Sequence, residues 1–188
     1  MANAGGFNPA GLATAITELI AAEGLTLRVA YIDGDNVMSG LEELQRAGHT
    51  LQNLDNGEPL TSWGAEPMAA NAYLGGWGIV DALSEGADIV VAGRVTDASL
   101  TVGPAAWWHG WQRTSWDELA GAATGGNFSG FLEAPSMIDL SFPVAEVSAD
   151  GSCVITKQSN RHGLVTVDTV TAQLIYEIQG PVYDLVRN

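Results

Sequence analysis

The segment that most restricts the fold of this chain is an apolar run that ends in a charged turn opened by glycine, residues 87–100. A short apolar run bounded by turn residues is typical of a strand buried in a parallel sheet. In open α/β sheets, ligands bind in the crevice beyond the carboxyl ends of the strands, and the helix that follows offers free N–H groups to an anion. Arg94 and Asp97, which lie in this turn, are therefore the first candidate functional residues. The alternative is a structural Arg–Asp pair that caps the turn.

Apolar periodicity predicts that helices and strands alternate along the first two thirds of the chain. Apolar residues recur at helical spacing over residues 9–23 and again over 68–86, while short apolar runs near 26–32 and 88–92 indicate strands. The polar stretch 49–67 lacks sustained periodicity, and we interpret it as a surface loop or lid. Because strands that alternate with helices favour parallel pairing, the chain is predicted to be α/β with a three-layer core.

The final third changes character. Two apolar runs flank Asp150-Gly151, and an Asp-Gly pair between such runs is the strongest short signal for a β-hairpin. We therefore predict an antiparallel hairpin near residues 144–157, followed by a helix that opens at Thr166. At 188 residues, the chain has the length of one ordinary domain, so residues 1–188 are predicted to form a single α/β domain.

Charge and cysteine content restrict the partners and the compartment. With 22 Asp and Glu against 7 Lys and Arg, the net charge is −15, so nucleic acids and anionic membrane surfaces are expected to be repelled. The lone Cys153 cannot form an internal disulfide, and no signal peptide or membrane span is evident. We therefore expect a cytoplasmic protein with no nucleic-acid or membrane partner.

Carboxylates follow the first predicted strand. Asp33 and Asp35 are separated by one residue at the carboxyl edge of the predicted sheet, and hard cations such as Mg²⁺ prefer oxygen ligands of this kind. Asp or Asn before a helix is also commonly a cap, and we favour a cap or a ligand contact over a metal site. The three histidines lack the spacing of a zinc motif. No metal site is assigned, the sequence requires no cofactor, and Mg²⁺ is the cation that these carboxylates would suit.

Two turns in the sequence combine paired glycines with an asparagine. Residues 3–6 and 124–127 each place paired glycines beside an asparagine, so that the backbone can approach a ligand while the amide both donates and accepts hydrogen bonds. Either turn could cradle a phosphate, a carboxylate or a thioester oxygen, and the alternative is a plain tight turn. His109 lies in the aromatic run 107–111. These aromatic residues could form the wall of a site for an apolar substrate, or they could simply pack at the end of a helix. We favour packing at the helix end.

Six segments occur in the same order as in the acyclic terpene utilisation (AtuA-like) family, which this chain resembles over nearly its whole length. They are residues 3–9, 71–75, 93–99, 123–128, 145–151 and 163–170. The resemblance implies a bacterial cytoplasmic protein encoded beside acyl-CoA carboxylase and lyase genes for branched isoprenoid acids.

The chain also departs from the family pattern. Family proteins are longer at both ends, and between Leu119 and Thr124 they carry an insert with a His and a Cys, so we expect an internal segment or a shortened member. Apolar surface that the extra segments would cover is then exposed. We therefore expect a homo-oligomer, formed through a strand edge or through residues 107–111.

The functional hypothesis is an α/β domain that acts on a small branched carboxylic acid or its CoA thioester by acid–base chemistry of the hydratase or lyase type. The alternative is a non-catalytic binding or assembly module of a larger complex. We expect Arg94, Asp97, Asn127 and one of Asp33 or Asp35 to line one pocket. The predicted catalytic residues are Arg94, Asp97 and Asp33, and the predicted ligand-binding residues are Asn3, Gly5, Gly6, Asp35, Asn71, Ser99, Thr124, Gly125, Gly126 and Asn127.

Overall fold

A small parallel sheet forms the centre of the N-terminal part of the molecule. The computed structural model describes residues 1–125, 142–178 and 180. Strands β1 (Val29–Ile32) and β2 (Ile89–Ala92) pair in parallel, with Val29 opposite Ile89. On the other edge of β2, Ala2 forms a parallel bridge to Val91. Val90, Val91 and Ala92 are at most 2% exposed, so β2 is the buried strand that its apolar sequence predicts.

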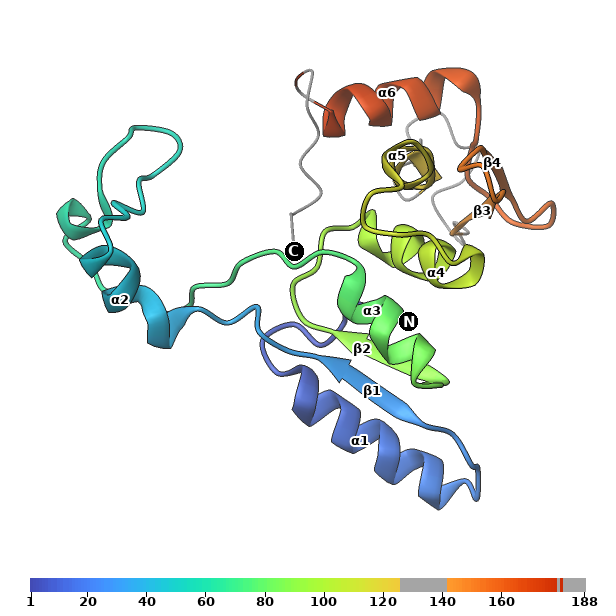
Figure 1. Ribbon diagram of the computed structural model, residues 1–188, viewed down its shortest axis with the longest axis horizontal. Coiled ribbons are helices and arrows are strands. Elements are labelled where there is room, and N and C mark those ends of the chain that lie inside the picture. Colours follow the sequence, from blue (N-terminus) through green and yellow to red (C-terminus); the bar gives the residue numbers. More distant parts are fainter. Residues whose placement is uncertain (126–141, 179, 181–188) are drawn as a thin grey trace.

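Helices cover both faces of this sheet. Helix α1 (Pro9–Ala22) packs on β1 and β2, and α3 (Trp77–Ser84) packs on the opposite face (Figure 1). Asn8 caps α1, because its side chain accepts a hydrogen bond from the N–H of Gly11 at 2.9 Å, and Pro9 suits the first helical position. The helix–sheet–helix arrangement turns the carboxyl ends of the strands toward the loops that carry the candidate residues.

A second core lies between later elements. Helix α4 (Ser99–His109) packs on α3 and on α5 (Trp116–Gly125), and α5 packs on the antiparallel hairpin of β3 (Pro143–Val147) and β4 (Cys153–Lys157). Trp111 is buried there, and its indole N–H donates to the Ala149 carbonyl at 3.0 Å. Hydrogen bonds from the hydroxyl and the N–H of Ser152 lower the pKa of Asp150 in the hairpin turn. Helix α6 (Val167–Glu177) follows, capped by Thr166 as predicted.

The segment between β1 and α3 projects from the sheet. It contains a short 3-10 turn (Met38–Gly40), α2 (Leu41–Arg46) and a second 3-10 turn (Leu60–Ser62). Figure 1 shows α2 apart from the sheet, at the left of the molecule. The stretch predicted as a surface loop is thus largely irregular and exposed, and its interpretation as a lid stays a prediction.

The predicted fold class is confirmed, since helices accompany a parallel pair of strands and an antiparallel hairpin. The helix predicted over 68–86 is wrong in its first half, because only Trp77–Ser84 is helical. Asn71 instead forms a bridge to Asn36, and Leu74 forms one to Val95. Backbone pairing with distant segments outweighs the helical periodicity there, and Gly75 and Gly76 weaken the helix propensity. Helix α5 was not predicted.

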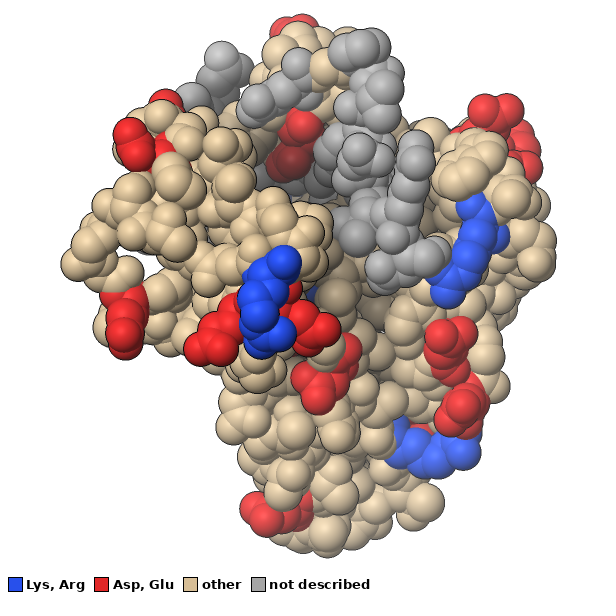
Figure 2. All heavy atoms as spheres, turned by 60° about the vertical axis from the view of Figure 1, so that its left-hand side comes forward, with Lys and Arg blue, Asp and Glu red and all other residues tan. Residues whose placement is uncertain are grey.

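The surface visible in Figure 2 carries more acidic than basic side chains, as the composition leads one to expect. Figure 2 shows acidic side chains spread over the visible face, with few basic ones among them. Within the described residues, no helix combines the length and the apolarity that crossing a membrane requires.

Candidate functional site

Four separate segments meet at the carboxyl end of the parallel sheet. The turn at residues 3–7 is joined to β2 by a hydrogen bond from the Gly5 N–H to the Ala92 carbonyl, at 3.0 Å. The Ala72 N–H donates to the Asp35 carbonyl at 2.8 Å, and the Leu74 N–H donates to the Arg94 carbonyl at 2.8 Å. The polar residues that follow both strands are therefore held against each other, as the rule for strand ends in open α/β sheets predicts.

Asp35 is the buried member of this cluster. It is 2% exposed, and its Oδ2 accepts hydrogen bonds from the Asn71 amide at 2.7 Å and from the Arg94 backbone N–H at 3.0 Å. A side chain at Gly93 has no room, because a Cβ there would lie 2.6 Å from Asp35 Oδ1. A buried carboxylate is tolerated only when hydrogen bonds replace its hydration, so Asp35 and Asn71 together fix the position of the Gly93–Arg94 backbone.

The Arg94 side chain is directed outward from this anchored backbone. The residue is exposed, and its guanidinium carbon lies 5.7 Å from the centre of the Phe7 ring. Across the described residues, the Arg94 side chain forms no ion pair, either with Asp97 or with another carboxylate. The alternative of a structural Arg94–Asp97 pair is therefore not what the structure contains, and the guanidinium is available to a ligand anion.

The first three residues of α4 do not offer the free N–H groups that the sequence suggested. The N–H groups of Ser99, Leu100 and Thr101 donate to the carbonyls of Thr96, Asp97 and Ala98, at 2.9, 3.2 and 3.0 Å. The preceding turn is wound tightly enough to satisfy these donors internally. Among the described residues, the N–H groups of Asp97 and Ala98 donate no hydrogen bond, so the expectation of an anion site at this helix terminus stays a prediction.

Free backbone donors also lie in the N-terminal turn. Among the hydrogen bonds of the described part of the chain, none is donated by the N–H groups of Asn3, Ala4, Gly6 or Phe7. Gly6 has a φ of +53°, which bends the backbone sharply. Consecutive turn N–H groups of this kind make anion-binding concavities, and Arg94 lies over the ring of Phe7 in the same turn.

The other predicted site residues are distributed unevenly. Asp33 and Asp97 are exposed, while Ser99 is buried with its hydroxyl 2.5 Å from that of Thr96. Thr124 and Gly125 end α5, which packs on α4 and the hairpin. Gly126 and Asn127 lie outside the described residues, so the prediction that Asn127 shares a pocket with Arg94 stays a prediction.

Other reactive side chains have structural surroundings. His109 bonds to the Val147 carbonyl through Nε2 at 3.0 Å and stacks on Trp111, with ring centres 5.2 Å apart, so the preference for helix-end packing is confirmed. Burial raises the pKa of the Cys153 thiol, which disfavours the nucleophilic thiolate. No group of three His, Cys, Asp or Glu that could hold a metal ion gathers among the residues that the structure describes.

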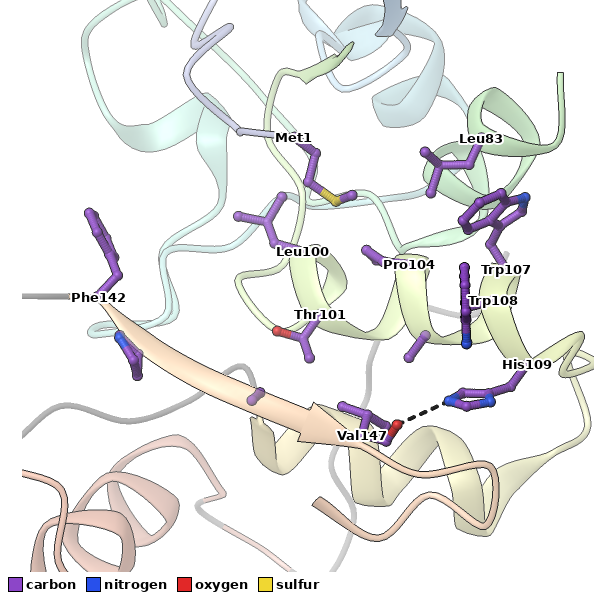
Figure 3. Close-up of a pocket in the computed structure, with 13 residues that line it drawn as sticks. Met1, Leu83, Leu100, Thr101, Pro104, Trp107, Trp108, His109, Phe142 and Val147 are labelled. Atoms are coloured by element: carbon purple, nitrogen blue, oxygen red, sulfur yellow. Dashed lines mark hydrogen bonds between the residues drawn. The ribbon is translucent and has the colours of Figure 1, made fainter. Parts of the chain in front are cut away.

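A cavity that the sequence did not predict lies between α4 and β3 (Figure 3). Its volume is about 600 Å³, within the range of small-molecule sites. Only the exposed tryptophans in 107–111 gave a signal for it in the sequence. The residues that line it are Met1, Leu83, Leu100, Thr101, Pro104, Ala105, Trp107, Trp108, His109, Phe142, Pro143, Ala145 and Val147.

Comparison with known families identifies the chain. The family model described as "Acyclic terpene utilisation family protein AtuA" matches residues 1–185. The chain belongs to the AtuA family. The resemblance found in the ordered sequence motifs is thereby confirmed, and the family name gives the chain a role in acyclic terpene utilisation. No curated protein and no solved structure matched the chain.

Proposed function

We propose that this AtuA protein binds the carboxylate or thioester oxygen of a small branched acid or acyl-CoA at the carboxyl end of the β1–β2 sheet. One observation carries the proposal: in a chain with a net charge of −15, the exposed guanidinium of Arg94 has no carboxylate partner among the described residues. An exposed guanidinium that is not neutralised by a carboxylate of its own chain can pair with a ligand anion. The hydrogen bond from the Arg94 N–H to Asp35 fixes the backbone of Arg94, so the proposed site is organised before the ligand binds.

The turn at residues 3–7 supports the same proposal. Arg94 can supply two N–H donors to a carboxylate, and the free N–H groups of Gly6 and Phe7 can bond further oxygens. The guanidinium carbon of Arg94 lies 5.7 Å from the centre of the Phe7 ring, a cation–π contact that helps to position the side chain.

Replacing Arg94 with alanine is expected to lower the affinity for a carboxylate at least about tenfold, because one charge-assisted hydrogen bond contributes about 1.5–3 kcal/mol. The free energy of unfolding should change little, since the side chain is exposed. Isobutyrate and isobutyryl-CoA are suitable probes, titrated by calorimetry at low ionic strength. Arg46→Ala is the matched control: it removes the same charge from exposed α2, apart from the sheet. Equal losses in both variants would contradict a site at Arg94.

Proton transfer is the second part of the proposal. Asp97 lies three residues beyond Arg94, and Asp33 follows β1 at the same end of the sheet. Both are exposed, so either can exchange protons with water and with a bound substrate. An arginine that binds the anion and an aspartate that transfers protons would suit the hydration, dehydration or retro-aldol cleavage of a branched acyl group.

Asp97→Asn is expected to slow deuterium incorporation from D₂O into bound branched acyl-CoA at least about a hundredfold, because a positioned general acid or base contributes roughly 10²–10⁴ in rate. Asp33→Asn is the parallel variant, and Asp117→Asn, in the first turn of α5, is the control. Proton NMR would follow the exchange.

The alternative is a non-catalytic binding module. It is favoured by the fact that the buried carboxylate, Asp35, is already engaged by Asn71 and the Arg94 N–H. A binding module would retain acyl-CoA affinity that depends on Arg94 but would incorporate no deuterium above the rate without protein.

A further inference from the structure

The cavity between α4 and β3 has the composition of a site for an uncharged ligand. Among the described residues that line it, none is an Asp, Glu, Lys or Arg. Figure 3 shows Thr101 on the side of α4 that faces β3, and Leu100 and Pro104 on the side nearer Met1 and Leu83. Trp107 and Trp108 lie toward the end of the same helix (Figure 3). Trp107 and Trp108 are 39% and 74% exposed, with ring centres 6.0 Å apart. Leaving such rings in water costs about 25 cal/mol per Å² of apolar area, so an apolar occupant gains by covering them.

Thr101 gives the cavity an unengaged hydroxyl group. Elsewhere in this chain, helical hydroxyls donate to the carbonyl four residues earlier: Thr14 to Ala10 at 3.0 Å and Thr17 to Ala13 at 2.8 Å. Among the described residues, the Thr101 hydroxyl has no hydrogen-bond partner, although it lines the cavity. The His109 ring, by contrast, is engaged by the Val147 carbonyl. A ligand oxygen beside Thr101 would therefore find a hydroxyl able to donate or accept.

We propose that this cavity binds a neutral aliphatic molecule of medium chain length that carries one oxygen, such as an alcohol, with that oxygen hydrogen-bonded to Thr101 and the chain against Trp107 and Trp108. Small-molecule sites combine a mostly apolar wall with few placed polar groups in about 300–1,000 Å³, and this cavity meets both conditions at about 600 Å³. A carboxylate would lose its hydration there without a cation to replace it. The site is separate from the anion site proposed at Arg94 and does not depend on it.

Titration with octanol tests the proposal, with octanoate as the charged analogue of equal chain length. Octanol should shift the tryptophan emission to shorter wavelength and bind at least about tenfold more tightly than octanoate does in the Arg94→Ala protein, where the proposed anion site is removed. Arg94→Ala should leave the octanol affinity unchanged. Loss of octanol binding in that variant would place the alcohol at the strand-end site and overturn the second site.

Two variants and one control variant locate the ligand. Thr101→Val keeps the shape but removes the hydroxyl, and should weaken octanol about two- to tenfold, the range for one neutral hydrogen bond. Ala145→Trp fills the cavity from β3 and should abolish binding, whereas Glu146→Trp places the same ring on the opposite side of the strand and should not. If circular dichroism shows that Ala145→Trp does not fold, the octanol affinity of Thr101→Val alone tests whether the ligand lies in this cavity.

Three further results would overturn the proposal. One is the absence of any emission shift up to the solubility limit of octanol. Another is an unchanged octanol affinity in Thr101→Val. The third is a dimer in sedimentation that Trp108→Ala converts to monomer while octanol fails to bind, because a second copy would then be the occupant of this surface.

Discussion

Replacing Gly151 with alanine is expected to lower the free energy of unfolding by about 2–5 kcal/mol, the largest stability effect that we expect of a single methyl group in this chain. Gly151 has a φ of +82°, in the left-handed region that favours glycine. A Cβ there would also lie 2.4 Å from the Cα of Glu118 in α5. Neither the new Cβ nor the Glu118 Cα can move alone, because the Cβ is fixed to the backbone of the hairpin turn and the Cα belongs to the backbone of α5. Urea unfolding followed by circular dichroism would measure the change.

Gly24→Ala provides the control that separates conformational strain from contact. Gly24 ends α1 with a φ of +64°, but a Cβ there would meet nothing within 4 Å. It should therefore show only the left-handed penalty, about 1–2 kcal/mol. Equal losses at the two positions would mean that α5 does not pack closely on the hairpin turn.

The second large effect is expected at Gly93, where alanine should lower the free energy of unfolding by about 1–3 kcal/mol. The new Cβ would approach both carboxylate oxygens of Asp35, at 2.6 and 2.8 Å. Asp35 cannot swing away, because it is buried and hydrogen-bonded to Asn71 and to the Arg94 N–H. The displaced turn should also weaken carboxylate binding at Arg94.

A double-mutant cycle identifies the atoms responsible. Asp35→Ala alone leaves two partly buried donors unsatisfied, the Asn71 amide and the Arg94 N–H, and should lower the free energy of unfolding by about 1–3 kcal/mol. Asp35→Ala also makes room for a methyl group at Gly93, so the double variant should lose about 0.5–3 kcal/mol less than the sum of the single losses. Strict additivity would show that Gly93 is required for a reason other than its contact with Asp35.

The structure explains why the sequence located the strand-end residues more reliably than it assigned their roles. The turn at Arg94 could be found because a buried strand, a glycine and a charged pair follow one another in the chain. The burial of Asp35 could not, since its donors come from Asn71 and Arg94, which are 36 and 59 residues away. The state of the α4 terminus could not be predicted for a related reason: which of its N–H groups are free depends on how tightly residues 96–101 wind.

The sequence by itself determined the features that arise within a few residues of each other. Helix α1 with its Asn8 cap, the Asp150-Gly151 hairpin, the Thr166 cap and the acidic surface all follow from local periodicity, capping, turn chemistry and composition. Tertiary structure decided what depends on distant partners. Residues 71–74 are extended because they pair with segments on both sides, despite a helical pattern of their own. The cavity exists because α4 and β3 come together across more than thirty residues of chain. Local signals carry no record of such pairings, whose energies arise only when the segments meet.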